Sequence, residues 1–179
     1  MHAIVSLLPE PYEQEVQSLW NELEDLCGLK GIHITPYPHF SWQVAKDYDF
    51  NLLDHTLEEI AHNTRPIIAS TTGLGLFTGP RPVIYIRVVK STPLVQFHQN
   101  LWQRTAMLAR GISAYYGPDL WIPHISLASE DVNASNIVPV IEYLAFRPFT
   151  WEMQVNNIAL IFQPAGEKGT LHSTYDFKG

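Results

Sequence analysis

The sequence has little cysteine and little positive charge. Its 179 residues include one cysteine, Cys27, which excludes a framework of internal disulfide bonds. The helical pattern around Cys27 indicates a core residue rather than a nucleophile. Only 11 Lys and Arg residues stand against 18 Asp and Glu residues, a formal net charge of −7 at pH 7. Because long nucleic acids are held mainly by basic contacts to phosphate, this charge favours a small anionic substrate or an RNA end over duplex nucleic acid.

Long hydrophobic runs are also missing. The apolar segment Ala3–Leu8 is too short for the core of a signal peptide and lacks a basic flank, and no stretch is long enough to span a membrane. We therefore expect a cytoplasmic protein without a membrane partner. A phosphate-binding glycine loop is missing as well, because the stretch Thr72–Gly75 lacks the lysine and the following helix that such a loop requires. ATP use is not indicated.

The most informative feature is a short phrase that occurs twice. Pro38–Trp42 reads Pro-His-Phe-Ser-Trp, and Pro123–Leu127 reads Pro-His-Ile-Ser-Leu. Composition alone predicts about 0.03 occurrences of Pro-His-x-Ser in a chain of this length. In a strand, side chains alternate between faces, so each phrase places a histidine and a serine on one face and apolar residues on the other. A third stretch, His33-Ile34-Thr35, lacks the proline and is interpreted as a loop or strand entry.

The two phrases lie at corresponding places in two similar halves. Their histidines are 85 residues apart. The periodicity of apolar residues predicts helices and strands in the same order in each half. We expect strands at 3–8, 65–77, 83–89, 151–162 and 171–177, besides the strands of the two phrases, which lie within 31–45 and 122–128, and helices at 12–29, 51–62, 93–110 and 135–144. The 46% apolar content suits one globular unit, and no linker divides it.

This pattern predicts an α+β fold made of two duplicated lobes. We expect two antiparallel sheets that face a central groove, with the helices on the outside. The first lobe would cover about residues 1–80 and the second about 81–179, and the lobes could exchange strands. Equivalent strands of duplicated halves would face each other, so both histidines would line the groove.

The paired phrases resemble the two His-x-[Ser/Thr]-x motifs of the 2H phosphoesterase superfamily, which includes 2′-5′ RNA ligase-like proteins and cyclic phosphodiesterases. The likeness extends to the order of elements and to Ile158–Asp176, which is similar to the last strand pair of that family. It implies a bilobal fold, a central groove, no metal or other cofactor, and action on 2′,3′-cyclic phosphates or related 2′-linked esters. The family's catalytic positions fall on His39, Ser41, His124 and Ser126. Both hydroxyl residues here are serine, where many members carry threonine.

These residue types suit the opening of a cyclic phosphodiester by water. Imidazole has a pKa of about 6.5, so one histidine can accept a proton from water while the other donates one to the leaving oxygen. Ser41 and Ser126 would donate hydrogen bonds to the phosphoryl oxygens. We expect His124 to be the base and His39 the acid, although a pseudo-symmetric site offers no sequence reason for either direction. A lone histidine is more often a strand cap or a satisfied core residue.

Metal binding is not expected at these histidines. Neither phrase has a second His, Cys or carboxylate at ligand spacing, and a metal site needs three or four ligands.

Residues that recognise the substrate are harder to identify. Tyr85 and Arg87 share one face of a strand, so Arg87 could attract a phosphate or could equally lie on a solvated outer face. Tyr175, in the last strand, could stack on a base or ribose. Four other aromatic residues are interpreted mainly as core or rim: Trp42, Tyr115, Tyr116 and Trp121.

The sequence therefore predicts a monomeric, metal-independent enzyme that hydrolyses a 2′,3′-cyclic phosphate or the 1″,2″-cyclic phosphate of ADP-ribose. Two alternatives remain open. One is a module that binds a nucleotide or an RNA end without catalysis, and the other is an enzyme that joins RNA ends through 2′-5′ linkages. The same four residues would serve all three functions.

Overall fold

The computed structural model describes all residues from 1 to 179 and has the predicted α+β architecture. Its four α-helices are α1 (Tyr12–Cys27), α2 (Phe50–His62), α3 (Thr92–Thr105) and α4 (Ile137–Ala145). Its nine strands are β1 (His2–Leu7), β2 (His39–Tyr48), β3 (Ile67–Phe77), β4 (Val83–Val88), β5 (Ala109–Ile112), β6 (His124–Ala128), β7 (Glu152–Val155), β8 (Asn157–Phe162) and β9 (Thr170–Asp176). Three short 3₁₀ helices, η1 (Gly31–Ile34), η2 (Ala106–Leu108) and η3 (Ala114–Tyr116), lie in the connections.

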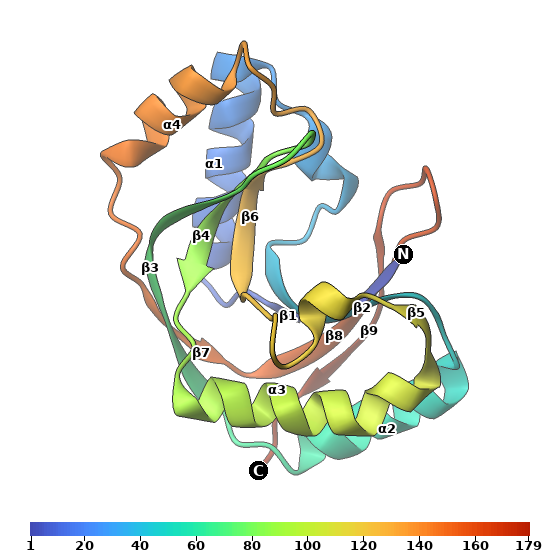
Figure 1. Cartoon of the computed structure of the whole chain (residues 1–179). Coiled ribbons are helices and arrows are strands. Elements are labelled where there is room, and N and C mark those ends of the chain that lie inside the picture. The colour runs from blue at the N-terminus through green and yellow to red at the C-terminus, as the bar shows by residue number, and fades with distance from the viewer.

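The strands form one curved antiparallel sheet in the order β7-β3-β4-β6-β2-β1-β8-β9, with β5 added to β2 (Figure 1). The two sheets expected from the sequence are the two ends of this sheet. They join where β2 meets β6, and a single residue pair, Phe40 with Ile125, makes that junction. Both side chains are fully buried. The two repeated phrases therefore lie at the centre of the sheet.

Each end of the sheet combines strands from both halves of the sequence. β3, from the first half, pairs with β4 and β7, whereas β8, from the second half, pairs with β1. The helices follow the same arrangement. α1 packs beside α4 and against β6, and α2 and α3 pack together at the other end of the molecule (Figure 1). The two halves of the sequence therefore share one sheet and pack their helices together.

The apolar faces of these elements bury the residues that the periodicity selected. In α1 the buried side chains are Val16, Leu19, Trp20 and Leu23, and the helix ends at Gly28, whose φ of 71° suits glycine. A stack of aromatic rings fills the space under β2. Trp42 lies 5.3 Å from Trp121, and His98 of α3 lies 3.9 Å from Trp121, between ring centroids. This stack supports the strand that carries His39 and Ser41.

Two elements differ from the prediction. The helix expected at 93–110 ends at Thr105, because residues 109–112 form β5 and pair with the edge of β2. The strand expected at 151–162 is two strands, since the chain crosses at Asn156 from β3 to β1. Backbone partners supplied by distant strands decided both cases. No helix combines the length and the apolar character needed to cross a bilayer.

Candidate active site

The four residues of the repeated phrases line one cavity. His39 and Ser41 come from the start of β2, and His124 and Ser126 from the start of β6. Phe40 and Ile125 pair between these strands and are buried, so alternation places the four polar side chains on the opposite face. The cavity has a volume of about 210 Å³. Its other lining residues are Trp20, Ile32, Ile34, Thr35, Tyr116, Ser129, Glu130 and Gln163.

Both imidazoles are held in the same tautomer. Nδ1 of His39 lies 2.5 Å from the carbonyl oxygen of Tyr37, and Nδ1 of His124 lies 2.7 Å from that of Ile122. A carbonyl oxygen only accepts hydrogen bonds, so Nδ1 carries the proton and donates in each ring. This leaves Nε2 of each ring free to exchange a proton in the cavity. Each histidine uses the residue two positions before it, across a proline, so the two halves repeat this contact as well.

Burial keeps both imidazoles neutral in the free protein. Desolvation lowers the pKa of His39 to about 4; the hydrogen bond to Tyr37 opposes this shift, and repulsion from a charged His124 adds to it. Desolvation also lowers the pKa of His124, against the effect of its bond to Ile122. Near pH 7 either ring can therefore act as a base at once. A general acid therefore requires a proton that neither ring holds in the free protein.

Two tryptophans hold the backbone of the two serines. The indole N–H of Trp121 donates to the carbonyl oxygen of Ser41 at 2.9 Å, and that of Trp20 donates to the carbonyl oxygen of Ser126 at 3.0 Å. Each indole comes from an element outside the strand that it braces. The sequence predicts Trp121 at the core or rim and Trp20 on the buried side of a helix. It does not predict their contacts with the two serines, because nothing in the local pattern links these residues.

The cavity also contains Tyr116, which the sequence does not single out as part of the site. Its hydroxyl is hydrogen-bonded to the side chain of Ser41, and burial raises the pKa of the phenol while this bond opposes the shift. The only charged residue in the lining is Glu130, which has a φ of 70° and forms an ion pair with Arg81 at 2.9 Å. No Lys or Arg lines the cavity.

Two of the three residues expected to bind substrate lie beside the cavity without lining it. Tyr85 pairs with Ser126, and Arg87 pairs with His124, between β4 and β6. Tyr85 is buried, and its ring lies 5.1 Å from the ring of His124, which it supports from one side. Arg87 is exposed to solvent. Tyr85 therefore packs against a histidine, and Arg87 is a solvent-exposed side chain on the same face of the sheet as His124, because directly paired residues of antiparallel strands point to the same side.

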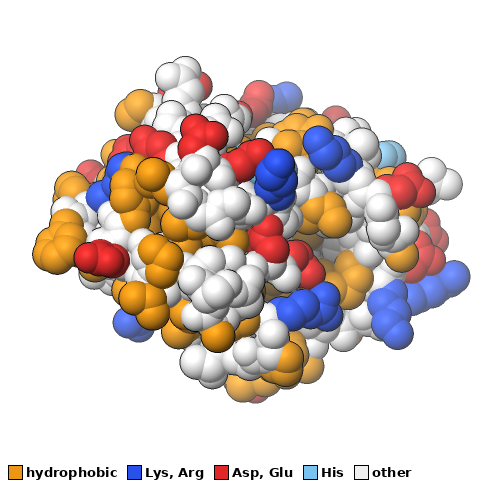
Figure 2. Space-filling view, turned by 90° about the horizontal axis from the view of Figure 1, so that it is seen from above, with side chains coloured by type: hydrophobic (Ala, Val, Ile, Leu, Met, Phe, Trp, Pro, Cys, Tyr) orange, Lys and Arg blue, Asp and Glu red, His pale blue; other side chains and the backbone are white.

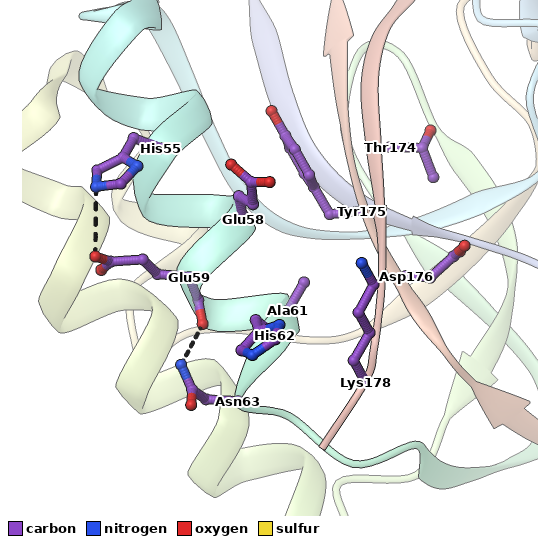
Figure 3. Close-up of a pocket in the computed structure, with 10 residues that line it drawn as sticks. All are labelled: His55, Glu58, Glu59, Ala61, His62, Asn63, Thr174, Tyr175, Asp176 and Lys178. Atoms are coloured by element: carbon purple, nitrogen blue, oxygen red, sulfur yellow. Dashed lines mark hydrogen bonds and ion pairs between the residues drawn. The ribbon is translucent and has the colours of Figure 1, made fainter.

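Tyr175 lies away from the histidines. Its hydroxyl donates to Asp54 of α2 at 2.8 Å, and its ring borders a different pocket between α2 and β9, which also contains His55, Glu58 and Asp176 (Figure 3). β9 pairs with β8 at the outer edge of the sheet, and Tyr175 is not among the residues that line the cavity of the two histidines. The expected contact of Tyr175 with the same substrate is therefore not supported.

The structure contains no group of three or more His, Cys, Asp or Glu side chains placed to hold a metal ion. The chemistry that this arrangement offers is proton transfer between two imidazoles, with hydroxyl donors between them.

Comparison with known proteins identifies the fold and the family of this chain. The chain is similar in structure to TT0787 of Thermus thermophilus, with a TM-score of 0.68 and 20% identity over 99% of this chain and 98% of that one. It is also similar to E. coli LigT complexed with 3′-AMP (TM-score 0.58) and to a protein described as a phosphoesterase (TM-score 0.57), each at 15% identity over 99% of this chain and 98% of the other. A search of curated sequences finds no significant match. The sequence profile of the 2′-5′ RNA ligase superfamily matches residues 8–167, and the chain therefore belongs to this superfamily of 2H phosphoesterases.

Proposed function

We propose that the protein hydrolyses a 2′,3′-cyclic phosphate, or the 1″,2″-cyclic phosphate of ADP-ribose, without a metal ion. The observation that carries this proposal is the placement of His39, Ser41, His124 and Ser126 in one cavity, with both Nδ1 atoms bound to carbonyl oxygens. In the reaction, the oxygen of water forms a bond to phosphorus while one ring oxygen of the cyclic ester leaves. One imidazole takes the proton of the water, and the other protonates the leaving alkoxide.

The hydroxyl groups suit a substrate with one negative charge. Ser41 and Ser126 can donate hydrogen bonds to the two non-bridging oxygens, which gain charge in the transition state. A phosphodiester carries one charge, whereas a phosphomonoester carries nearly two at neutral pH. With no Lys or Arg in the lining and with Glu130 present, the cavity favours the diester.

Substrate binding would also favour uptake of the missing proton from solvent. An anion close to an imidazole favours its charged form and raises its pKa. The phosphate of the substrate would therefore reverse part of the desolvation that keeps His39 and His124 neutral. One ring would take a proton from solvent as the substrate enters, and the other would stay neutral as the base.

The test is an assay with 2′,3′-cyclic mononucleotides in the presence of EDTA. We expect turnover by the unmodified protein and a loss of about 10²–10⁴-fold in kcat for each of His39→Ala and His124→Ala. A matched control is His55→Ala, since His55 is an exposed residue of α2 outside the cavity. Full activity in either of the first two variants would contradict the proposal.

One observation favours a second function, binding without catalysis. Both imidazoles have lowered pKa values, so neither is ready to donate a proton before an anion binds. A binding module would bind a 2′-nucleotide in calorimetry and show no turnover in the same buffer.

A long RNA partner is less well supported than a small ligand. Lys and Arg side chains on the face in Figure 2 are interspersed with Asp and Glu and with hydrophobic side chains. The net charge of −7 agrees with that mixture. Binding of long RNA would need a continuous basic surface.

A further inference from the structure

A second cavity opens directly beside the first. It has a volume of about 550 Å³ and shares two lining residues, His124 and Tyr116, with the cavity of the two motifs. Its walls come from the end of β3, the start of β4 and the segment that leads into β6. They include Leu76, Phe77, Val83, Tyr115, Leu120 and Ile122. We refer to this space as the apolar cleft.

The apolar cleft differs in chemistry from the cavity that it adjoins. Seven of its nine lining residues are hydrophobic, and none is charged. Leu76, Leu120 and Ile122 are large hydrophobic side chains left exposed to solvent here. A group of such side chains in a concave site is typical of a place where a ligand removes apolar surface from water.

Aromatic rings give the apolar cleft a preference among apolar ligands. The side chain of Tyr115 is 79% exposed, so its ring is available for stacking. The ring of Phe77 contacts His124 edge to face, with centroids 4.9 Å apart and an angle of 85° between planes. A ligand that binds beside the ring of Phe77 would therefore lie next to the imidazole of His124. Stacking on aromatic side chains is the usual way in which proteins hold an unpaired base.

We propose that the apolar cleft binds the nucleobase of the substrate whose cyclic phosphate lies between His39 and His124. This inference rests on the proposed function and narrows it to nucleoside cyclic phosphates without further phosphate groups. A pyrophosphate, as in ADP-ribose, would find no Lys or Arg in the lining of either cavity. An uncharged planar base meets no such obstacle.

The test compares three substrates that differ in the base: adenosine 2′,3′-cyclic phosphate, uridine 2′,3′-cyclic phosphate and a base-free ribose 2,3-cyclic phosphate. Stacking contributes about 1–3 kcal/mol per base, which corresponds to about 5- to 150-fold in kcat/KM. We expect kcat/KM to fall by that factor for the base-free compound. Adenosine should exceed uridine because its ring system covers more of the cleft.

Two variants test whether the dependence of kcat/KM on the base arises in the apolar cleft. Tyr115→Ala should lower kcat/KM for the adenosine substrate at least fivefold and leave the base-free substrate unchanged. The exposure of Tyr115 makes the fold tolerant of this change. Phe146→Ala is the control, because Phe146 is 90% exposed beyond the end of α4 and lines neither cavity. It should leave all three substrates unaffected.

Two results would overturn the inference. One is equal kcat/KM for the base-free and adenosine substrates, and the other is an equal loss for both in Tyr115→Ala. If no cyclic phosphate is hydrolysed, the proposed function fails, and calorimetry with 2′-AMP and ribose 2-phosphate then tests the cleft alone. The inference is supported if 2′-AMP binds more tightly than ribose 2-phosphate and if Tyr115→Ala removes this difference. Equal affinities for the two compounds would contradict it. A Tyr115→Ala variant that changes only the self-association of the protein would contradict it as well.

Discussion

The low pKa of His39 leads to a specific pH dependence of catalysis. The difference between the ordinary value of 6.5 and about 4 corresponds to ~3 kcal/mol against the charged ring in the free protein. At pH 7 only about one molecule in 1,000 would carry a proton on His39. Because desolvation lowers the pKa of His124 as well, the state with one proton on the pair is a minor one at neutral pH.

The assay is the pH profile of kcat and of kcat/KM for a 2′,3′-cyclic nucleotide between pH 5 and 9 at constant ionic strength. The value of kcat/KM follows ionisation of the free enzyme, so it should fall about tenfold per pH unit above pH 7. The value of kcat follows ionisation of the enzyme with bound substrate. Since the phosphate raises the pKa of the imidazole, the fall in kcat should begin at a higher pH.

A kcat/KM that stays constant from pH 6 to 9 would refute this reasoning. If both rings are neutral in the free protein and catalysis needs one of them protonated, kcat/KM must fall as the pH rises. A kcat and a kcat/KM that fall at the same pH would show that the substrate does not raise the pKa of either ring.

Three further predictions concern stability and charge. Trp121→Phe removes the hydrogen bond to the carbonyl oxygen of Ser41; it should lower the free energy of unfolding by about 1–2 kcal/mol in urea titrations and also lower kcat. Desolvation lowers the pKa of His39 and of His98 to about 4, so the unfolded state binds more protons than the folded state between pH 6.5 and 4. The free energy of unfolding should therefore decrease as the pH falls through this range, and less steeply in His98→Gln. Glu130→Gln removes the only carboxylate in the lining of the cavity, so KM for an anionic substrate should fall severalfold at low salt, and kcat should change little. An unchanged KM would mean that Arg81 already neutralises Glu130.

Local patterns were sufficient for much of the fold and for the centre of the site. Helical periodicity identified α1 and α2, and alternation placed His39 with Ser41 on one face of β2. These features depend on residues close together in the chain. The same reasoning did not reveal strand β5 at 109–112 or the contact of Tyr175 with Asp54, because both depend on which distant segments the fold brings together.

By itself, the sequence determined that two strands would each present an imidazole and a hydroxyl on the face opposite an apolar one. Only the tertiary structure decided that these strands meet through Phe40 and Ile125, which brings the four side chains into one cavity. It also decided that carbonyl oxygens orient the imidazoles, that indoles from other elements hold the serines, and that an apolar cleft adjoins His124. The physical reason is that such contacts join residues far apart in the chain, and they form only when the whole sheet buries its apolar face.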